Sequence, residues 1–164
     1  NVYGPREILG AGEWRGTPAT VWRNVTPTFV YRALKDQNLL LENEGENSRD
    51  FIFVEDLVEG LISCATHGEV GGIYNLASGV ETTIRELAEA ILDEVKTDAE
   101  LELLPARSWD RSGRRFGSTE KSQNEIGFVA TTSLSEGIRR TVAWTKGNLE
   151  NIDQAVKKHS KYFQ

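Results

Sequence analysis

Arginines are the residues of this chain best suited to hold a phosphate group. A guanidinium offers a planar fork of N–H donors that matches two phosphate oxygens. Arg49 directly precedes an apolar stretch with the pattern of a strand, so a sheet could hold its backbone in place. The alternative is a surface arginine paired with a nearby carboxylate, either Asp50 or Glu46.

The densest basic cluster of the chain lies further along, between positions 107 and 115. It contains Arg107, Arg111, Arg114 and Arg115, although the formal net charge of the chain is -6. Two arginines that converge on one diphosphate would neutralise its charge. A solvated loop is the alternative for this stretch.

The glycine-rich stretch 10–16 imitates a loop that binds the pyrophosphate of a dinucleotide. Such a loop needs a strand before it and a helix after it, because the N-terminus of the helix holds the phosphates. Here only Ile8 and Leu9 precede the stretch, and Pro18 stands where the helix should run. The sequence therefore predicts a glycine-rich loop without a dinucleotide role.

Tyr31 and Lys35 have the Tyr-x-x-x-Lys spacing of a catalytic pair. On a helix this spacing puts both side chains on one face. In such a pair the lysine lowers the pKa of the tyrosine, whose phenolate then acts as a base. A gap of this length between two common residues arises easily by chance, so the prediction is a surface helix without a catalytic role.

Composition excludes several classes of protein. The chain has 164 residues, of which 38% are hydrophobic, so one domain with a core can form. The acidic balance argues against a nucleic-acid partner, and no apolar run approaches the roughly 20 residues of a membrane span. The single cysteine, Cys64, and two isolated histidines offer neither a disulfide nor a metal site. We expect a cytoplasmic protein without a membrane partner.

Hydrophobic periodicity predicts strands that alternate with helices, and so an α/β fold. The clearest helix follows Thr83, which has capping-box spacing with Glu86. Strands are predicted at 1–3, 39–41, 51–54, 73–76 and 101–104. Helices are predicted from about 26, 56, 84, 119 and 133, with a polar helical tail from about 148.

A series of motifs runs in a fixed order along residues 1–147. It includes Asn1-Val2-Tyr3-Gly4-Pro5-Arg6, then Arg49-Asp50-Phe51-x-Phe53-Val54-x-Asp56, Tyr74-Asn75-Leu76-x-x-Gly79, Lys121 with Glu125-Ile126-Gly127-Phe128, and Leu134-x-Glu136-Gly137-Ile138. This series resembles the carboxy-terminal portion of the extended short-chain dehydrogenases. These are NAD-dependent nucleotide-sugar epimerases and dehydratases, of which UDP-glucose 4-epimerase is the nearest type.

The resemblance implies a fold and the part of the enzyme to which this chain belongs. The chain would be the C-terminal part of a Rossmann-type enzyme, with a small substrate-binding α/β region at 1–147 and a helical tail at 148–164. In such enzymes the NAD-binding glycine motif and the catalytic tyrosine and lysine precede the Asn1 motif. The expectation is therefore a fragment without a catalytic residue, whose parent is a homodimer that binds NAD mainly through a missing N-terminal part.

The resemblance also implies a substrate site. Arg49 and Arg114 would contact the diphosphate of a nucleoside-diphosphate sugar, with Arg115 as the neighbouring alternative to Arg114. Asn1 would approach the diphosphate and the sugar, since a side-chain amide can donate there. Glu42 stands where the family usually has an aromatic residue over the base. The base pocket would be bordered by Leu39, Leu40 and Leu41, for which a core strand is the alternative.

The implied function is nucleotide-sugar binding within an enzyme that oxidises a sugar hydroxyl by hydride transfer to NAD. Epimerisation, dehydration and decarboxylation share that first step, and these residues do not choose among them. One alternative is a non-catalytic nucleotide-sugar binding or scaffold module. Another is an isomerase-like enzyme that acts on sugars without a diphosphate.

Overall fold

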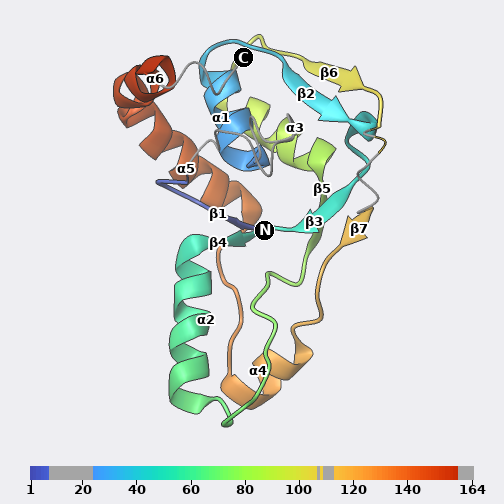
Figure 1. The fold of residues 1–164 in the computed structure, drawn as a ribbon, viewed down its shortest axis with the longest axis vertical. Helices are drawn as coiled ribbons and strands as arrows, with labels where there is room; N and C mark the ends of the chain where they lie inside the picture. The colour runs from blue at the N-terminus through green and yellow to red at the C-terminus, as the bar shows by residue number, and fades with distance from the viewer. Residues whose placement is uncertain (8–23, 107, 109–112, 159–164) are drawn as a thin grey trace.

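The structure, a computed structural model, describes residues 1–7, 24–106, 108 and 113–158. The glycine-rich stretch 10–16, Arg107 and Arg111 lie outside these described residues. Short strands and helices are interspersed along the described chain, and Figure 1 shows an upper group of helices joined to a lower group through the strands β1 and β4.

The large core lies between three helices and a two-stranded sheet. Helices α1 (Val25–Leu34), α3 (Ile84–Val95) and α5 (Leu134–Gly147) pack against one another. Strand β2 (Leu39–Glu42) contacts α1 and α3 and pairs in parallel with β6 (Leu101–Leu104), as Figure 1 shows. The buried members of this core are Tyr3, Phe29, Val30, Ala33, Leu39, Leu41, Phe51, Phe53, Leu87, Ala88, Ile91, Ile138 and Val142.

Helix α3 shows how a local pattern determines an element. Thr83 Oγ1 accepts a hydrogen bond from the Glu86 backbone N–H at 3.1 Å, and Glu86 Oε2 accepts one from the Thr83 N–H at 2.7 Å. The predicted capping box is thus confirmed, and it satisfies N–H groups at the start of the helix. Leu87, Ala88 and Ile91 recur at helical spacing and are fully buried.

Strand β4 (Ile52–Phe53) stands between the large core and a small one. It pairs in parallel with β1 (Val2–Tyr3). Successive side chains of a strand point to opposite faces, so Phe53 enters the large core and Ile52 enters the small core. The small core has Ile52, Ile126 and Phe128 as buried members, with Leu57, Cys64, Tyr74, Leu76 and Ala130 packed around them.

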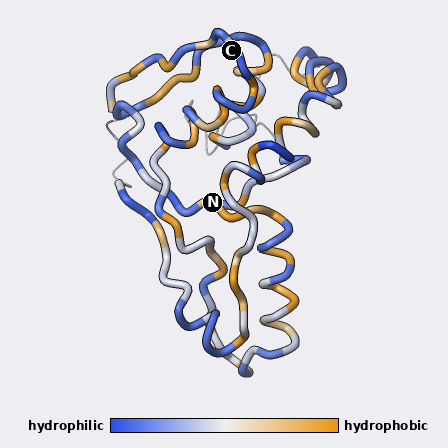
Figure 2. Tube along the Cα trace, turned by 180° about the vertical axis from the view of Figure 1, so that it is seen from behind, coloured by the Kyte–Doolittle hydropathy of each residue, from blue (hydrophilic) through white to orange (hydrophobic). Residues whose placement is uncertain are grey.

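Helices α2 (Val54–His67) and α4 (Glu120–Ile126) contact each other beside the small core. Hydrophobic residues recur along the whole of α2 (Figure 2). A carboxylate beside the start of a helix often caps it, but Asp56 lies inside the first turn of α2. Its carboxylate instead accepts hydrogen bonds from the backbone N–H groups of Thr131 and Thr132, at 3.3 and 3.0 Å. Asp56 therefore holds α2 to the segment that precedes α5.

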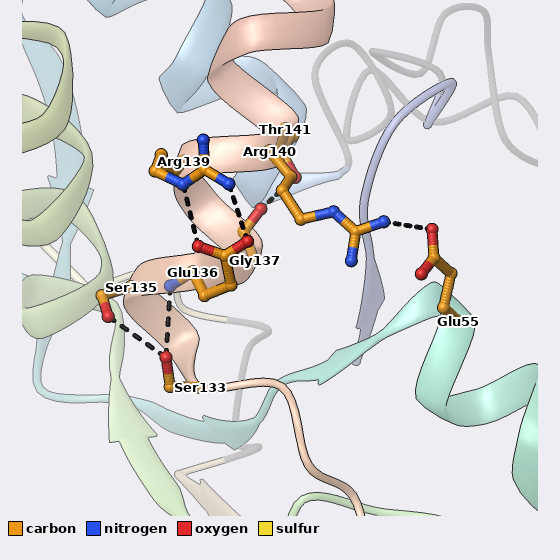
Figure 3. Close-up of polar contacts among 8 residues, drawn as sticks. All are labelled: Glu55, Ser133, Ser135, Glu136, Gly137, Arg139, Arg140 and Thr141. Carbon is orange, nitrogen blue, oxygen red and sulfur yellow. Dashed lines mark hydrogen bonds and ion pairs between the residues drawn. The ribbon is translucent and has the colours of Figure 1, made fainter.

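Polar contacts near the start of α5 join it to α2 (Figure 3). Ser133 Oγ accepts a hydrogen bond from the Glu136 N–H at 3.2 Å, as the spacing of the two residues predicts. Arg140 forms an ion pair with Glu55 of α2. Its guanidinium also lies 4.6 Å from the centre of the Phe53 ring.

The close approach of α5 to β1 requires a glycine at position 137. A Cβ atom at Gly137 would lie 2.0 Å from Tyr3 Oη. Tyr3 is buried, and its hydroxyl donates a hydrogen bond to the Leu134 carbonyl at 3.4 Å. A larger residue at 137 would therefore displace Tyr3 from the large core.

A three-stranded sheet carries the candidate site. Its central strand is β3 (Ser48–Asp50), which is antiparallel to β5 (Glu81–Thr83) and parallel to β7 (Arg114–Arg115). A short 3-10 turn, η1 (Asn43–Gly45), follows β2 and leads toward β3. The sheet is connected to the large core twice, because β3 follows β2 through η1 and β5 runs directly into α3.

The strand expected at 73–76 does not form. Ile73 is 81% exposed, and no described strand pairs with this segment. An apolar pattern reports a preference for burial, whereas a strand also needs a neighbour with which to exchange hydrogen bonds. The prediction was wrong for that reason. No described helix is long and apolar enough to cross a membrane.

Candidate anion-binding site

The register of the three-stranded sheet determines on which of its two faces Arg49, Arg114 and Arg115 lie. Arg49 of β3 is the partner of Arg115 in β7, and Ser48 is the partner of Arg114. Side chains alternate along a strand, so Arg49 and Arg115 share one face while Arg114 projects from the other. The structure thus brings Arg115, rather than Arg114, beside Arg49.

Arg114 is engaged on its own face by Glu81 of β5. Its Nε and Nη2 atoms donate to Glu81 Oε1 and Oε2 at 2.7 and 2.5 Å. Ser48 Oγ donates to the same carboxylate. The Arg114 guanidinium, helped by Ser48, lowers the pKa of Glu81 to about 2. This bidentate pair links the two outer strands across β3, so Arg114 holds β7 in register.

Arg49 fastens β3 to the chain that enters β7. Its Nη1 atom donates to the carbonyl of Ser48 at 2.6 Å and to that of Gly113 at 2.8 Å. The neighbouring carboxylate of Asp50 accepts hydrogen bonds from the backbone N–H groups of Ser78 and Gly79, at 2.7 and 2.9 Å. Asp50 therefore has a structural role, because it fixes the loop ahead of β5.

Asn1 lies alongside these residues. Its carbonyl accepts a hydrogen bond from the Ile52 N–H at 2.9 Å, and its amino group donates to the Asp50 carbonyl. Asn1 thus lies beside Asp50, the neighbour of Arg49 in β3. The role of Asn1, Arg49 and Arg115 in binding stays a prediction.

The three leucines of β2 are not equivalent. Leu39 and Leu41 are fully buried members of the large core, as their alternative interpretation held. Leu40 points to the opposite face of the strand and is half-buried. Of the three side chains, only that of Leu40 could border a ligand without a change in the core.

Glu7 is a residue of this region that the sequence reasoning missed. Burial raises the pKa of its carboxyl to about 7, against the opposing effects of Gly4 and the Asn1 amino group. Its Oε2 atom is buried and, among the described residues, has no hydrogen-bond partner. No local signal could have revealed it, because the burial comes from the folded chain around it.

The Tyr31–Lys35 pair serves a structural purpose. Tyr31 Oη donates to Asp153 Oδ1 at 2.8 Å, and Lys35 Nζ donates to Asp153 Oδ2 at 2.7 Å. Asp153 belongs to α6 (Leu149–Lys158), so the pair holds this helix to α1. Burial and the bond to Asp153 raise the pKa of Tyr31 to about 12. A catalytic tyrosine needs the opposite shift, which supports the prediction of no catalytic role.

The part of the chain that the structure describes contains neither a metal site nor a dinucleotide-binding loop. No group of histidine, cysteine and carboxylate side chains within it could hold a metal ion. No glycine-rich loop within it joins a strand to the N-terminus of a helix, which is the arrangement that cradles a dinucleotide pyrophosphate. The described residues thus fit an anion held by arginines.

Comparison with protein families identifies the relatives of this chain. Residues 1–77 match the NAD dependent epimerase/dehydratase family. UDP-glucuronic acid decarboxylase 1 of Arabidopsis thaliana is 29% identical over 154 residues, which are 94% of this chain and 32% of that protein. UDP-glucose 4-epimerase of Mycolicibacterium smegmatis is 31% identical over 142 residues, which are 87% of this chain and 42% of that protein.

Solved structures show the same relationship. WbmF of Bordetella bronchiseptica, in complex with NAD+ and UDP, is 57% identical with a TM-score of 0.84, and the match covers 98% of this chain and 47% of that one. UDP-glucose 4-epimerase of Thermotoga maritima, with UDP-glucose, is 26% identical with a TM-score of 0.78, and the match covers 91% of this chain and 44% of that one. The chain thus spans under half the length of these relatives.

The family match corrects one prediction. The family model matches residues 1–77, the amino-terminal half of this chain. The prediction of a carboxy-terminal, substrate-binding portion, with the fold class built on it, is therefore wrong. Local motifs reveal a relationship but do not reveal which part of a longer fold they occupy. What the comparisons support is an α/β chain related to the NAD-dependent nucleotide-sugar epimerases and dehydratases.

Proposed function

We propose that this chain binds the diphosphate of a nucleotide sugar through Arg49 and Arg115, as part of an NAD-dependent epimerase or dehydratase. The observation that carries the proposal is the register of β3 and β7, which puts both guanidinium groups on one face of the sheet. Asn1 adds a side-chain amide beside them. WbmF, solved with UDP, and the Thermotoga epimerase, solved with UDP-glucose, make a uridine diphosphate sugar the first ligand to test.

Arg114 contributes indirectly in this proposal. Its bidentate pair with Glu81 satisfies its charge and fixes β7, which leaves Arg115 to meet the ligand. Arg115 is exposed, and no hydrogen bond or ion pair engages it within the described part of the chain. Each charge-assisted hydrogen bond to a phosphate is worth about 1.5–3 kcal/mol, so one such bond from each arginine contributes about 3–6 kcal/mol to binding of the diphosphate.

The remaining parts of the ligand are assigned to neighbouring elements. Leu40, on the outer face of β2, would border the base, with Glu42 at the end of the same strand. Because an acidic side chain replaces the expected aromatic one, hydrogen bonding rather than stacking would hold the base edge. NAD would supply hydride transfer in the whole protein, and the outcome as epimerisation, dehydration or decarboxylation is set by residues outside this site.

Calorimetric titration with UDP, UDP-glucose, dTDP and GDP tests the proposal. Arg115→Ala should weaken UDP binding about 10-fold, or about 1.4 kcal/mol, and Arg49→Glu should weaken it further. Arg139→Ala is the matched control, since Arg139 pairs with Glu136 on the surface of α5. An affinity for UDP that is the same in wild type and Arg49→Glu, or no wild-type binding at all, would overturn the assignment.

A non-catalytic nucleotide-sugar binding module is the second candidate. The contacts of Tyr31 and Lys35 with Asp153 favour it, because the one Tyr-x-x-x-Lys pair of the chain is engaged in joining α1 to α6. The two candidates differ in turnover. Incubation of the full-length gene product with NAD and UDP-glucose, followed by chromatography of the sugars, should give UDP-galactose or a keto sugar if the protein is the enzyme, and no new sugar if it is the binding module.

A further inference from the structure

The turn between β2 and β3 joins the two parts of the candidate site. Residues 43–47 separate β2, which carries Leu40, from β3, which carries Arg49. A base beside Leu40 and a diphosphate at Arg49 would therefore lie at a distance from each other that this turn fixes. Its first part, η1, contacts β2, β6 and α3, so the turn is packed against elements that surround the large core.

The backbone of this turn has a conformation that most residues avoid. Asn43, Glu44 and Gly45 have φ angles of 50°, 55° and 78°, which lie in the left-handed region that favours glycine. The Cβ atoms of Asn43 and Glu44 make this region unfavourable, although asparagine tolerates it better than glutamate. Such a conformation persists only where surrounding contacts hold it in place.

Arg85, in the first turn of α3, supplies such a contact. Its Nη2 atom donates a hydrogen bond to the Glu44 carbonyl at 2.7 Å. The backbone of Arg85 lies directly against Gly45, where an added Cβ atom would be 2.9 Å from Arg85 Cβ and 3.0 Å from Arg85 N. One residue earlier, the Ile84 N–H donates to the Asn47 carbonyl at 2.9 Å. The start of α3 therefore holds the turn at two points.

The charge of Arg85 also suits this position. Glu42, Glu44 and Glu46 place a carboxylate at every second residue of this stretch, and like charges so close together repel one another. A guanidinium that is bonded to the Glu44 carbonyl offsets this repulsion. Arg85 therefore stabilises the turn both through a hydrogen bond and through its charge.

We infer that Arg85 is a positioning residue, which sets the distance between the base-binding and diphosphate-binding parts of the site by holding the turn at Glu44. This inference rests on the proposed function, because it requires a nucleotide whose base lies beside β2 and whose diphosphate lies at Arg49. Arg85 acts through the turn and not by contact with the ligand, since its guanidinium is engaged by the Glu44 carbonyl.

A general electrostatic role is the alternative for Arg85. A positive charge near the site attracts any anion, so its loss would weaken the binding of UDP and of inorganic pyrophosphate alike. A positioning role predicts a different result, because two parts of a ligand reinforce each other only where the geometry lets both bind at once. UDP should then lose affinity, whereas pyrophosphate, which has no base, should keep it.

Titration of the full-length gene product separates the two roles. Calorimetry measures the affinity for UDP, and competition with UDP measures the weaker affinity for inorganic pyrophosphate. Arg85→Ala should weaken UDP binding about 10-fold and change pyrophosphate binding less than about 2-fold. Arg85→Lys, which keeps a donor for the Glu44 carbonyl, should recover most of the loss. Arg139→Ala, on the surface of α5, is the control and should change neither affinity.

Gly45→Ala repeats the test without removing a charge. The new Cβ atom would lie 2.8 Å from Leu41 Cδ2 and 2.9 Å from Arg85 Cβ, so the turn must shift. The same selective loss of UDP affinity is expected. If Arg85→Ala fails to fold, Arg85→Met replaces it, because methionine keeps the apolar stem on the helix and removes the donor.

Equal weakening of UDP and pyrophosphate binding in Arg85→Ala would overturn the inference and assign a general electrostatic role to Arg85. An unchanged UDP affinity in Arg85→Ala would also overturn it, and weaker binding of both ligands in Arg49→Glu would then leave the proposed function intact. If the UDP affinity does not depend on Arg49, the proposed function fails and the inference fails with it.

Discussion

The large core and the small core are built from the same kinds of residue and differ in how far the described chain closes them. Thirteen buried side chains fill the large core and three fill the small one. Helices α1, α3 and α5 contact one another around the large core. Beside the small core, α2 packs Leu57 and Gly60 against its neighbours and leaves Val58, Leu61 and Ile62 exposed.

The difference separates two sources of stability. The large core can support folding of the described chain through its own burial of apolar surface. The small core must open more easily, because few contacts are lost when α2 and α4 separate from it. The candidate site belongs to the stable part, since β5 runs into α3. Diphosphate binding should therefore survive changes that loosen α2.

The largest expected effect comes from truncating one side chain in each core. Leu87→Ala should lower the free energy of unfolding by about 3 kcal/mol, because Leu87 is fully buried between helices. Ile126→Ala should mainly speed hydrogen exchange in α2 and α4 and leave the α3 amides protected. Urea unfolding and hydrogen exchange measure the two effects. Equal loss of α3 protection in both variants would contradict the division into two cores.

A change in pH should act at the junction of the two cores, where β1 is followed by Glu7. Burial raises the pKa of Glu7 from 4.5 to about 7, so the folded chain retains a proton that the unfolded chain releases. Stability should fall as pH rises from about 4.5 to about 7. The loss is expected to be roughly 1–2 kcal/mol after allowance for solvent screening.

Glu7→Gln removes this dependence. The variant should have nearly constant stability over the same range and should exceed wild type above pH 7. Urea unfolding at pH 5, 6, 7 and 8 provides the measurement. Glu120→Gln, an exposed acidic position at the start of α4, is the control and should leave the wild-type dependence intact.

The smallest effect concerns α6, which contributes no buried residue. Asp153→Asn should weaken the contacts to Tyr31 and Lys35 and bring the pKa of Tyr31 down from about 12. It should lower the free energy of unfolding by less than about 1 kcal/mol. Ultraviolet titration of tyrosine and hydrogen exchange of α6 follow the change. Asp93→Asn breaks an ion pair with Lys96 at the surface and should change neither the tyrosine titration nor the hydrogen exchange of α6. If Asp93→Asn changed them as much as Asp153→Asn does, Asp153 would have no specific role in holding α6.

The sequence predicted those features that depend on neighbours along the chain. The capping box at Thr83 and the helix after it follow from residues three and four positions apart, so α3 was predicted closely. The same holds for the helix that begins after Ser133. In each case hydrogen bonds and apolar contacts within one turn supply the information.

Features that depend on distant partners could not be predicted in this way. Strands β3, β5 and β7 have two or three residues each, too few for a periodic signal, and they exist only because the fold brings them together. The shared face of Arg49 and Arg115 depends on that pairing, which no motif of the sequence reports. The shifted pKa of Glu7 likewise arises only when the chain around it has folded.

The contact between Gly137 and Tyr3 has an evolutionary consequence. With no room for a Cβ atom beside the Tyr3 hydroxyl, the two positions cannot change independently. A lineage that acquires alanine or serine at 137 must first, or at once, acquire a smaller residue at 3. Homologous sequences should therefore record these two sites as a co-varying pair, although they stand near opposite ends of the chain and neither bears on the ligand.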